Sequence, residues 1–298
     1  MDLVAGKTAV VTGAASGIGL ALAERFARDG LALVLADVDQ GALDAAGERV
    51  ASKGVEVLTV RTDVSDQAAV AALAEASVTR FGQVHLVCNN AGVSSRADPW
   101  LGPLSAWEWV LGVNLWGVVH GVRAFLPILA AQGDGHIVNT ASIAGLVPGF
   151  GPAYDASKHA VVALSEDLYT TLKTAGLPVG VSVLCPGWVR TGILDSERNW
   201  PDSLGAVPDE APAAAVTRPH VRRAIDEGMT PAEVADRVAE AVTKEKFWVF
   251  PNPEFLEIAV RRWQDIAEGL DPVLGRDTPG LPPAEELLAE VRASLQQP

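Results

Sequence analysis

The segment Thr8-Ala9-Val10-Val11-Thr12-Gly13-Ala14-Ala15-Ser16-Gly17-Ile18-Gly19 decides which folds the chain can adopt. Its apolar first half predicts a buried strand, and the residues from Gly17 to Arg28 have the period of a helix. Glycines between a strand and a helix permit a tight turn whose backbone can approach a pyrophosphate at the helix N-terminus. The spacing Gly-x3-Gly-x-Gly departs from the common GxGxxG, and an ordinary glycine-rich turn also fits it. The position between a strand and a helix favours a dinucleotide site.

Outward from this turn, short apolar runs alternate with longer amphipathic stretches. The runs predict strands at Thr8–Thr12, Ala32–Asp37, Val55–Arg61, Leu86–Asn89, His136–Thr140, Gly180–Leu184 and Phe247–Phe250. The amphipathic stretches predict helices at Gly17–Arg28, Gln40–Lys53, Asp66–Phe81, Ala106–Ala131 and Ala153–Thr174. Because strands and helices alternate, the sequence predicts a doubly wound α/β fold. Its seven-stranded, mainly parallel sheet would be covered by helices on both faces.

Two segments interrupt this alternation. Residues 190–228 contain several prolines and predict an irregular insertion with short helices. Such a long loop is typical of a substrate lid, and it can also cover bare sheet. Residues 251–298 predict a C-terminal extension with helices at Glu254–Glu268 and Pro283–Gln296. No stretch resembles an interdomain linker, so we expect one domain over residues 1–298.

The composition argues against several classes of protein. The chain has 298 residues with 23 basic and 37 acidic side chains, and this net charge of −14 argues against binding to nucleic acid or an anionic membrane. Cys88 and Cys185 are far apart and the five histidines are scattered, so we expect no metal site and a reducing, cytoplasmic setting. The N-terminus lacks the pattern of a signal peptide, and we expect no segment apolar and long enough to span a bilayer.

Acidic residues at the ends of two predicted strands indicate which nucleotide binds. Asp37 can accept hydrogen bonds from ribose hydroxyls and would repel a 2′-phosphate. Neither the glycine-rich turn nor Val38 offers a cation, so NAD is favoured over NADP; a plain turn residue is the alternative for Asp37. Asp63 is placed to meet the adenine edge. Its alternative role is to cap the next helix, for which Ser65 and Asp66 are better suited.

Tyr154 and Lys158 stand four residues apart in a long helical stretch, where positions i and i+4 share one face. A phenol with a pKa near 10 is a poor base at neutral pH. A neighbouring ammonium and the positive charge of an oxidised nicotinamide would lower that pKa, which makes the pair suited to proton transfer. On spacing alone, the pair also fits an ordinary contact on a helix surface.

Taken together, the motifs resemble the short-chain dehydrogenase/reductase family. The further motifs are Asn89-Asn90-Ala91-Gly92 after the fourth strand, Ser142, and Pro186-Gly187 after the sixth strand. They occur in the family's order and spacing over residues 5 to about 250. The resemblance implies a Rossmann-type fold, an enzyme that transfers a hydride between an alcohol or ketone and NAD, and dimers or tetramers formed through the two long central helices.

The resemblance implies a role for each of four catalytic residues. Tyr154 would be the general acid/base, and Lys158 would bind the nicotinamide ribose and lower the tyrosine pKa. Ser142 would hydrogen-bond to the substrate oxygen, with a loop serine as the alternative, and Asn114 would orient a water for proton relay. The cofactor-binding residues would be Gly13, Ser16, Gly17, Ile18, Gly19, Asp37, Asp63, Val64, Asn90, Ala91, Gly92, Tyr154, Lys158, Pro186, Gly187, Val189 and Thr191.

The resemblance also implies where the substrate lies. Its contacts would be Ser94, Ile143, Leu146, Phe150, Trp188 and Leu194. This set is apolar and aromatic, without paired arginines for a carboxylate or phosphate, so we expect a bulky, neutral secondary alcohol or its ketone. A dihydrodiol or hydroxysteroid dehydrogenase of the same family is the alternative. A non-catalytic dinucleotide-binding protein is a more distant one, against which the complete catalytic set argues.

Overall fold

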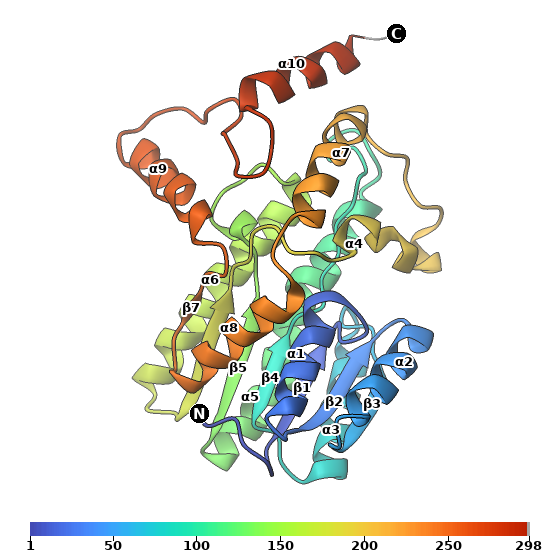
Figure 1. Ribbon diagram of the computed structural model, residues 1–298, viewed down its shortest axis with the longest axis vertical. Coiled ribbons are helices and arrows are strands. Elements are labelled where there is room, and N and C mark those ends of the chain that lie inside the picture. Colours follow the sequence, from blue (N-terminus) through green and yellow to red (C-terminus); the bar gives the residue numbers. More distant parts are fainter. Residues whose placement is uncertain (297–298) are drawn as a thin grey trace.

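The computed structural model describes residues 1–296 and is built around one sheet of seven parallel strands (Figure 1). The strands are β1 Thr8–Thr12, β2 Ala32–Asp37, β3 Val57–Arg61, β4 Leu86–Asn89, β5 Gly135–Thr140, β6 Val179–Leu184 and β7 Trp248–Val249. Their order is β3-β2-β1-β4-β5-β6-β7, so the connections run outward in both directions from β1. The predicted doubly wound parallel sheet is confirmed, and the point where the order reverses is where such sheets bind ligands.

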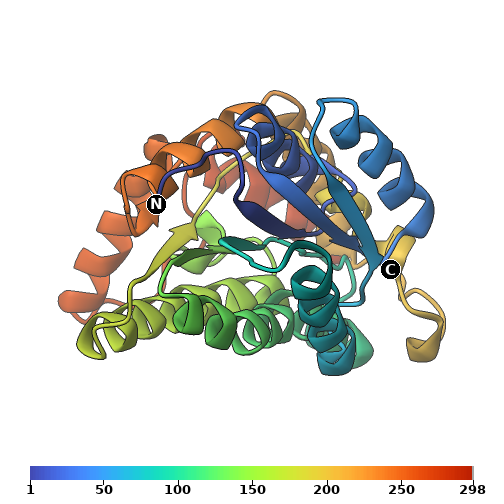
Figure 2. The ribbon, with the colours of Figure 1, turned by 90° about the horizontal axis from the view of Figure 1, so that it is seen from below.

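Helices cover both faces of the sheet (Figure 2). Helices α1 Gly17–Arg28, α2 Gln40–Ala51 and α8 Pro231–Thr243 lie on one face, where they bury Phe26, Leu43 and Val238 against the strands. Helices α3 Gln67–Phe81, α5 Gly117–Gln132 and α6 Pro152–Thr174 lie on the other, where Leu73 and Phe125 are buried. Because both faces are covered, the strands consist of nearly continuous apolar runs.

Helix α8 is the main element that the sequence analysis missed. It begins at a capping box, in which Thr230 Oγ1 accepts from Glu233 N at 3.2 Å and the Glu233 carboxylate accepts from Thr230 N at 2.8 Å. The signal is present in the sequence as Thr230-Pro231-x-Glu233, because proline is favoured at the first position of a helix. Its apolar face packs on α1.

The helical stretch Ser105–Gln132 corrects two expectations. It is not one helix, because a π-helical segment, Gly112–Trp116, separates α4 Ser105–Leu111 from α5. By length and composition it could also cross a membrane, so the prediction that no segment qualifies is wrong. In this structure Phe125 and Leu129 of the stretch are buried in the core, which accounts for the apolar character of its inner face.

Above the carboxyl ends of the strands lies a second region, which we call the roof and define as residues 190–228 and 251–296 (Figure 1). The first part contains the 3₁₀ segment Ile193–Asn199 and α7 Pro212–Asp226, and the second contains α9 Leu256–Ala267 and α10 Ala284–Leu295. At 15 residues, α7 is longer than the short helices expected there. His220 of α7 lies 3.1 Å from the Glu290 carboxylate of α10, so the two parts of the roof meet.

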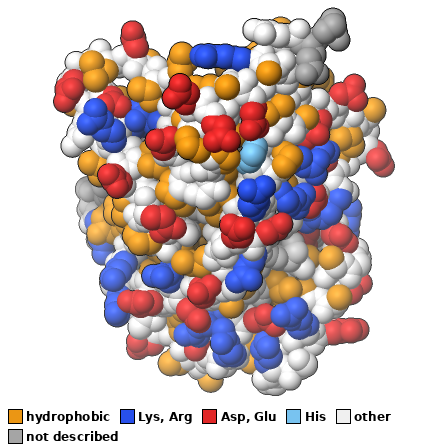
Figure 3. Space-filling model, turned by 45° about the horizontal axis from the view of Figure 1, so that its top comes forward, with side chains coloured by type: hydrophobic (Ala, Val, Ile, Leu, Met, Phe, Trp, Pro, Cys, Tyr) orange, Lys and Arg blue, Asp and Glu red, His pale blue; other side chains and the backbone are white. Residues whose placement is uncertain are grey.

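The surface shows acidic, basic and apolar side chains interspersed rather than separated (Figure 3). The net charge of −14 is therefore spread over a mixed exterior, at least on this face, and does not by itself mark a binding site.

Candidate active site

One large cavity, of about 1410 Å³, opens between the carboxyl ends of the strands and the roof. Almost every residue predicted to contact cofactor or substrate lines it, together with Ser142, Tyr154 and Lys158. Three predicted residues do not: Gly19, Asn114 and Leu146. Ligand pockets commonly measure about 300–1,000 Å³, so this one has room for more than a single small molecule.

The glycine-rich turn after β1 forms the floor of the cavity. Gly13 has φ +64°, a conformation that favours glycine, and a Cβ there would lie 2.8 Å from Ala91 Cα. A Cβ on Gly19 would collide with Gly13 O and lie 2.7 Å from Asn90 Nδ2. Gly19 therefore serves close packing of α1 beneath the turn and does not line the cavity, and its predicted contact with the cofactor stays a prediction.

Asp37 stands at the carboxyl end of β2, directly beside this turn. One carboxylate oxygen accepts from Ala15 N at 3.0 Å and the other from Asp39 N at 3.1 Å. Two main-chain donors hold the carboxylate in place at the rim of the cavity. Asp63 also lines the cavity and accepts from Ser65 N and Ser65 Oγ, while Asp66 caps α3, as expected for the better capping residue.

Thr12 organises the loop after β4, a role that the sequence analysis did not identify. Its hydroxyl accepts from Asn90 N at 2.9 Å and from Ala91 N at 3.1 Å, and Asn90 Nδ2 donates to Thr12 O at 3.0 Å. These contacts bind the β1 and β4 ends together, so Asn90 and Ala91 line the cavity opposite Gly13. A threonine directly before the glycine turn was the available signal.

Tyr154 and Lys158 share one face of α6, and Ser142 approaches from the end of β5. Lys158 Nζ donates to Thr140 O at 2.9 Å and lies 5.6 Å from the centre of the Tyr154 ring. Burial raises the pKa of Tyr154 to about 12, while the Ser142 hydroxyl opposes that shift by hydrogen bonding. Burial lowers the pKa of Lys158 to about 8. The three groups thus converge on one point of the cavity wall.

Asn114 lies within the π-helical segment, behind this group. Its Oδ1 accepts from Val93 N at 2.8 Å, and its Nδ2 donates to Val93 O at 3.0 Å and Ser157 Oγ at 3.1 Å. The buried side-chain amide therefore ties the loop after β4 to α6 and does not reach the cavity. Single-turn π segments occur frequently at functional sites. The proposed water-orienting role of Asn114 stays a prediction.

Asp155 is a second residue that the sequence analysis missed. Its carboxylate accepts from Gly149 N at 2.7 Å and from Phe150 N at 3.2 Å, which fixes the loop that carries Phe150 into the cavity. Burial raises the pKa of Asp155 to about 6, against the lowering effect of these hydrogen bonds. The only signal in the sequence was an acidic residue in the first turn of a helix, shortly after the two glycines Gly149 and Gly151.

Aromatic side chains form the cavity wall between the group Ser142, Tyr154 and Lys158 and the roof. Trp188 packs edge-on against Phe150 and Phe255, with ring centres 5.5 and 6.1 Å apart, and its Nε1 donates to Pro279 O at 2.6 Å. The C-terminal extension thus reaches the loop after β6, and several of its apolar residues line the cavity. Leu146 instead packs against the core around Val161 and Val162, so its predicted substrate contact is not met.

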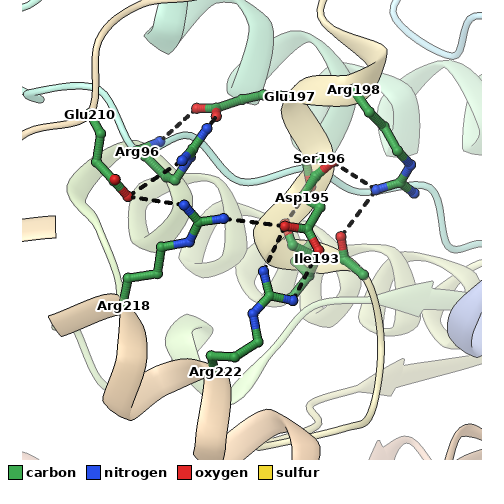
Figure 4. A network of polar contacts seen from close by, with 10 residues as sticks. Arg96, Ile193, Asp195, Ser196, Glu197, Arg198, Glu210, Arg218 and Arg222 are labelled. Atoms are coloured by element: carbon green, nitrogen blue, oxygen red, sulfur yellow. Dashed lines mark hydrogen bonds and ion pairs between the residues drawn. The ribbon is translucent and has the colours of Figure 1, made fainter. Parts of the chain in front are cut away.

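A charged network holds the first part of the roof, residues 190–228 (Figure 4). Arg96 lies between Glu197 and Glu210, with Nε 2.6 Å from Glu197 Oε2, and Asp195 lies between Arg218 and Arg222. Hydrogen bonds from Arg222 hold the pKa of Asp195 below its usual value. Because Arg96 follows Ser94 and Asp195 follows Leu194, this network fixes two cavity-lining segments to α7.

The arrangement is that of a dinucleotide-dependent oxidoreductase: a glycine cradle, an acid at the β2 end, and a serine, a tyrosine and a lysine at one point of the wall. Among residues 1–296, no group of three metal-ligating side chains comes together. The sequence matches the family model described as short chain dehydrogenase over residues 7–202. The chain belongs to the short-chain dehydrogenase/reductase family of oxidoreductases.

Known proteins extend the likeness beyond the family motifs. A short-chain dehydrogenase/reductase from Burkholderia phymatum, solved in complex with NAD, is 44% identical, with a TM-score of 0.90 over 93% of this chain and 100% of that chain. The 1-deoxy-11-beta-hydroxypentalenate dehydrogenase of Streptomyces avermitilis is 40% identical over 83% of this chain and 85% of its own. The 3beta-hydroxysteroid dehydrogenase 2 of Eggerthella lenta is 36% identical over 64% of this chain and 74% of its own.

Proposed function

We propose that the protein is an NAD-dependent dehydrogenase that interconverts a bulky, apolar or aromatic secondary alcohol and its ketone. The observation that carries the proposal is the convergence of Ser142, Tyr154 and Lys158 on a cavity whose floor is a glycine cradle. The charged and polar groups needed for proton transfer stand beside the space that a nicotinamide would fill.

The floor of the cavity fits NAD. No side chain can occupy the position of the Gly13 Cβ, and the start of α1 offers main-chain N–H groups to a pyrophosphate. Asp37 would bind the adenosine ribose, and Asn90 and Ala91 would form the wall beside that ribose. Thr191 would contact the nicotinamide end of the cofactor. The Burkholderia phymatum relative solved with NAD supports this assignment.

NAD, when bound, supplies the hydride acceptor and, in its oxidised form, a positive charge. Tyr154 Oη takes the hydroxyl proton of the alcohol, and Ser142 Oγ holds the substrate oxygen by a hydrogen bond. Burial and, to a smaller extent, the charge of Asp155 raise the pKa of Tyr154, so cationic charge nearby is required for the phenolate to form. The Lys158 ammonium, fixed by Thr140 O, supplies part of that charge from the same helix.

The walls favour a bulky apolar substrate. Phe150, Trp188 and Phe255 offer aromatic surface, and the roof adds aliphatic side chains such as Leu281 and Leu288. The names of the Streptomyces and Eggerthella relatives indicate a hydroxypentalenate and a hydroxysteroid as their substrates. A hydroxysteroid dehydrogenase is therefore the second candidate within the same chemistry.

The test is a screen of NAD reduction, followed at 340 nm, over secondary alcohols that range from short alkanols to aryl, terpenoid and steroid alcohols. We expect turnover of large apolar alcohols and a loss of about 10²–10⁴-fold in kcat for Tyr154→Phe with NADH binding retained. Full turnover by Tyr154→Phe would contradict the assignment of the acid/base.

The proposal includes the setting of the enzyme. We propose one catalytic domain over residues 1–298, a cytoplasmic location, and a homodimer or homotetramer formed through α5 and α6. Trp116, 54% exposed next to the start of α5, supports a contact there. Light scattering of the purified protein checks the oligomeric state, and a monomer across the micromolar range would rule this part out.

A further inference from the structure

A cation lies beside the acid that is proposed to choose the cofactor. Arg61 is the last residue of β3 and pairs in register with Asp37, the last residue of β2. Paired residues of neighbouring strands point to the same face of a sheet. Both residues line the cavity at its adenosine end. The sequence analysis found no cation near this position, because Arg61 lies 24 residues further along the chain.

The contacts of Arg61 leave most of its guanidinium available. Its Nε donates to Val38 O at 3.1 Å, which draws the side chain across the first residue after β2. Within residues 1–296, Arg61 takes part in no ion pair, in contrast to Arg96, Arg218 and Arg222 of the roof. Arg61 is solvent-exposed, and its tether to a main-chain oxygen limits where the free nitrogens can lie.

The two charges act in opposite directions on the same part of a nucleotide. Asp37, held by Ala15 N and Asp39 N, accepts a ribose hydroxyl and repels a phosphate at the 2′ position. An arginine beside a ribose can bind such a phosphate through two parallel hydrogen bonds. A site with Asp37 alone would exclude NADP, whereas a site with both residues penalises it less.

We propose that Arg61 is a second determinant of cofactor choice: its guanidinium attracts the 2′-phosphate of NADP and offsets part of the repulsion from Asp37. The inference rests on the proposed nucleotide site and adds a residue to it. Removing the negative charge of Asp37 should therefore be enough to turn the site toward NADP, since the required cation is already in place.

The test measures the dissociation constants of NADH and NADPH by quenching of tryptophan fluorescence, without substrate. The proteins are the wild type, Asp37→Asn, Arg61→Gln and the double variant, with Arg80→Gln as a control that removes an exposed cation outside the cavity. We expect Asp37→Asn to bind NADPH at least 10-fold more tightly than the wild type does. We expect Arg61→Gln to weaken NADPH binding about 10-fold in both backgrounds, with NADH unchanged within 2-fold. Arg80→Gln should change neither.

The outcomes separate this inference from the function on which it rests. If the wild type binds neither nucleotide, the proposed cofactor itself is wrong. If NADH binds and Arg61→Gln leaves NADPH affinity unchanged in the Asp37→Asn background, Arg61 has no part in cofactor choice. An equal loss of NADH and NADPH affinity would also overturn the inference, because it would mean a contact with the shared adenosine rather than with the phosphate.

Discussion

The sheet region and the roof differ in how their parts are held together. The sheet region buries whole strands, and its ends are fixed by hydrogen bonds such as those of Thr12, Asn90 and Asp37. The roof buries fewer apolar side chains, such as Ile225 and Phe255, and is also joined by ion pairs and aromatic contacts. Its helix α10 has no buried residue among those described. The family model ends at residue 202, so most of the roof lies beyond it. From this difference we propose that the sheet region supplies the shared chemistry and that the roof selects the substrate.

The largest effect should follow from a change at the catalytic wall of the sheet region. Ser142→Ala removes the donor proposed for the substrate oxygen, and loss of one such donor typically costs about 10²–10³-fold in kcat. Steady-state kinetics with the best alcohol of the screen measures it, with Ser52→Ala at the exposed end of α2 as the control. A loss confined to KM would mean that Ser142 binds substrate without stabilising the reacting oxygen.

A change beneath the cofactor floor should weaken binding and stability together. In Gly19→Ala the new Cβ collides with Gly13 O, and overpacking of this kind costs about 1–3 kcal/mol of unfolding free energy. NADH affinity should fall by at least 10-fold, because the cradle must shift. Gly41→Ala is the matched control, since its Cβ meets nothing closer than Asp39 Oδ1 at 3.8 Å. Urea unfolding measures the free energy of unfolding, and fluorescence titration measures NADH affinity. If both values were the same in Gly19→Ala and Gly41→Ala, the packing argument would be wrong.

A change where the sheet region meets the roof should alter substrate choice and spare the chemistry. Trp188→Ala removes the ring contacts with Phe150 and Phe255 and the hydrogen bond to Pro279 O. We expect KM for a polycyclic alcohol to rise about 10-fold, while kcat for a short alkanol stays within 3-fold. Trp263→Ala, on the outer side of α9 with 58% exposure, serves as the control. Equal losses for both substrates would place Trp188 in the shared machinery.

The smallest effect should be a pH dependence of the loop that carries Phe150, where the sheet region meets the roof. Folding raises the pKa of Asp155 from 3.8 to about 6, so the native state takes up a proton as the pH falls through 6. The protonated carboxyl is a weaker acceptor for Gly149 N and Phe150 N, and the loop that carries Phe150 loosens.

We expect KM for a bulky alcohol to rise about 3-fold between pH 7 and pH 5 in the wild type. In Asp155→Asn, KM should be raised at both values and nearly independent of pH. His159 and Arg262 line the same small hollow as Asp155 and are unchanged in Asp155→Asn. The difference between the wild type and this variant therefore reports on Asp155. A pH dependence of equal size in Asp155→Asn would contradict the role of Asp155.

The sheet region was largely predictable from the sequence, because buried parallel strands leave unmistakable apolar runs and the glycine-rich turn marks where they begin. The residues that were missed act through neighbours that only the folded chain brings close to them. Strand pairing brings Arg61 beside Asp37, and Asp155 accepts a hydrogen bond from Gly149 N because the loop before α6 bends back. Asn114 was recognised by motif, but its burial behind Val93 depends on the π-helical segment, which helix periodicity does not reveal. Leu146, directly after the short helical turn Ile143–Gly145, packs partly buried against the core and does not line the cavity.

The most direct test of the account is the fate of one hydrogen. A secondary alcohol from the screen, deuterated at the carbinol carbon, is incubated with NAD and the protein, and the reduced cofactor is analysed by mass spectrometry and proton NMR. The account predicts that deuterium appears at C4 of the nicotinamide, on one face only, and that Tyr154→Phe slows its appearance about 10²-fold or more. Formation of reduced cofactor without deuterium, or no transfer from any alcohol of the screen, would contradict it.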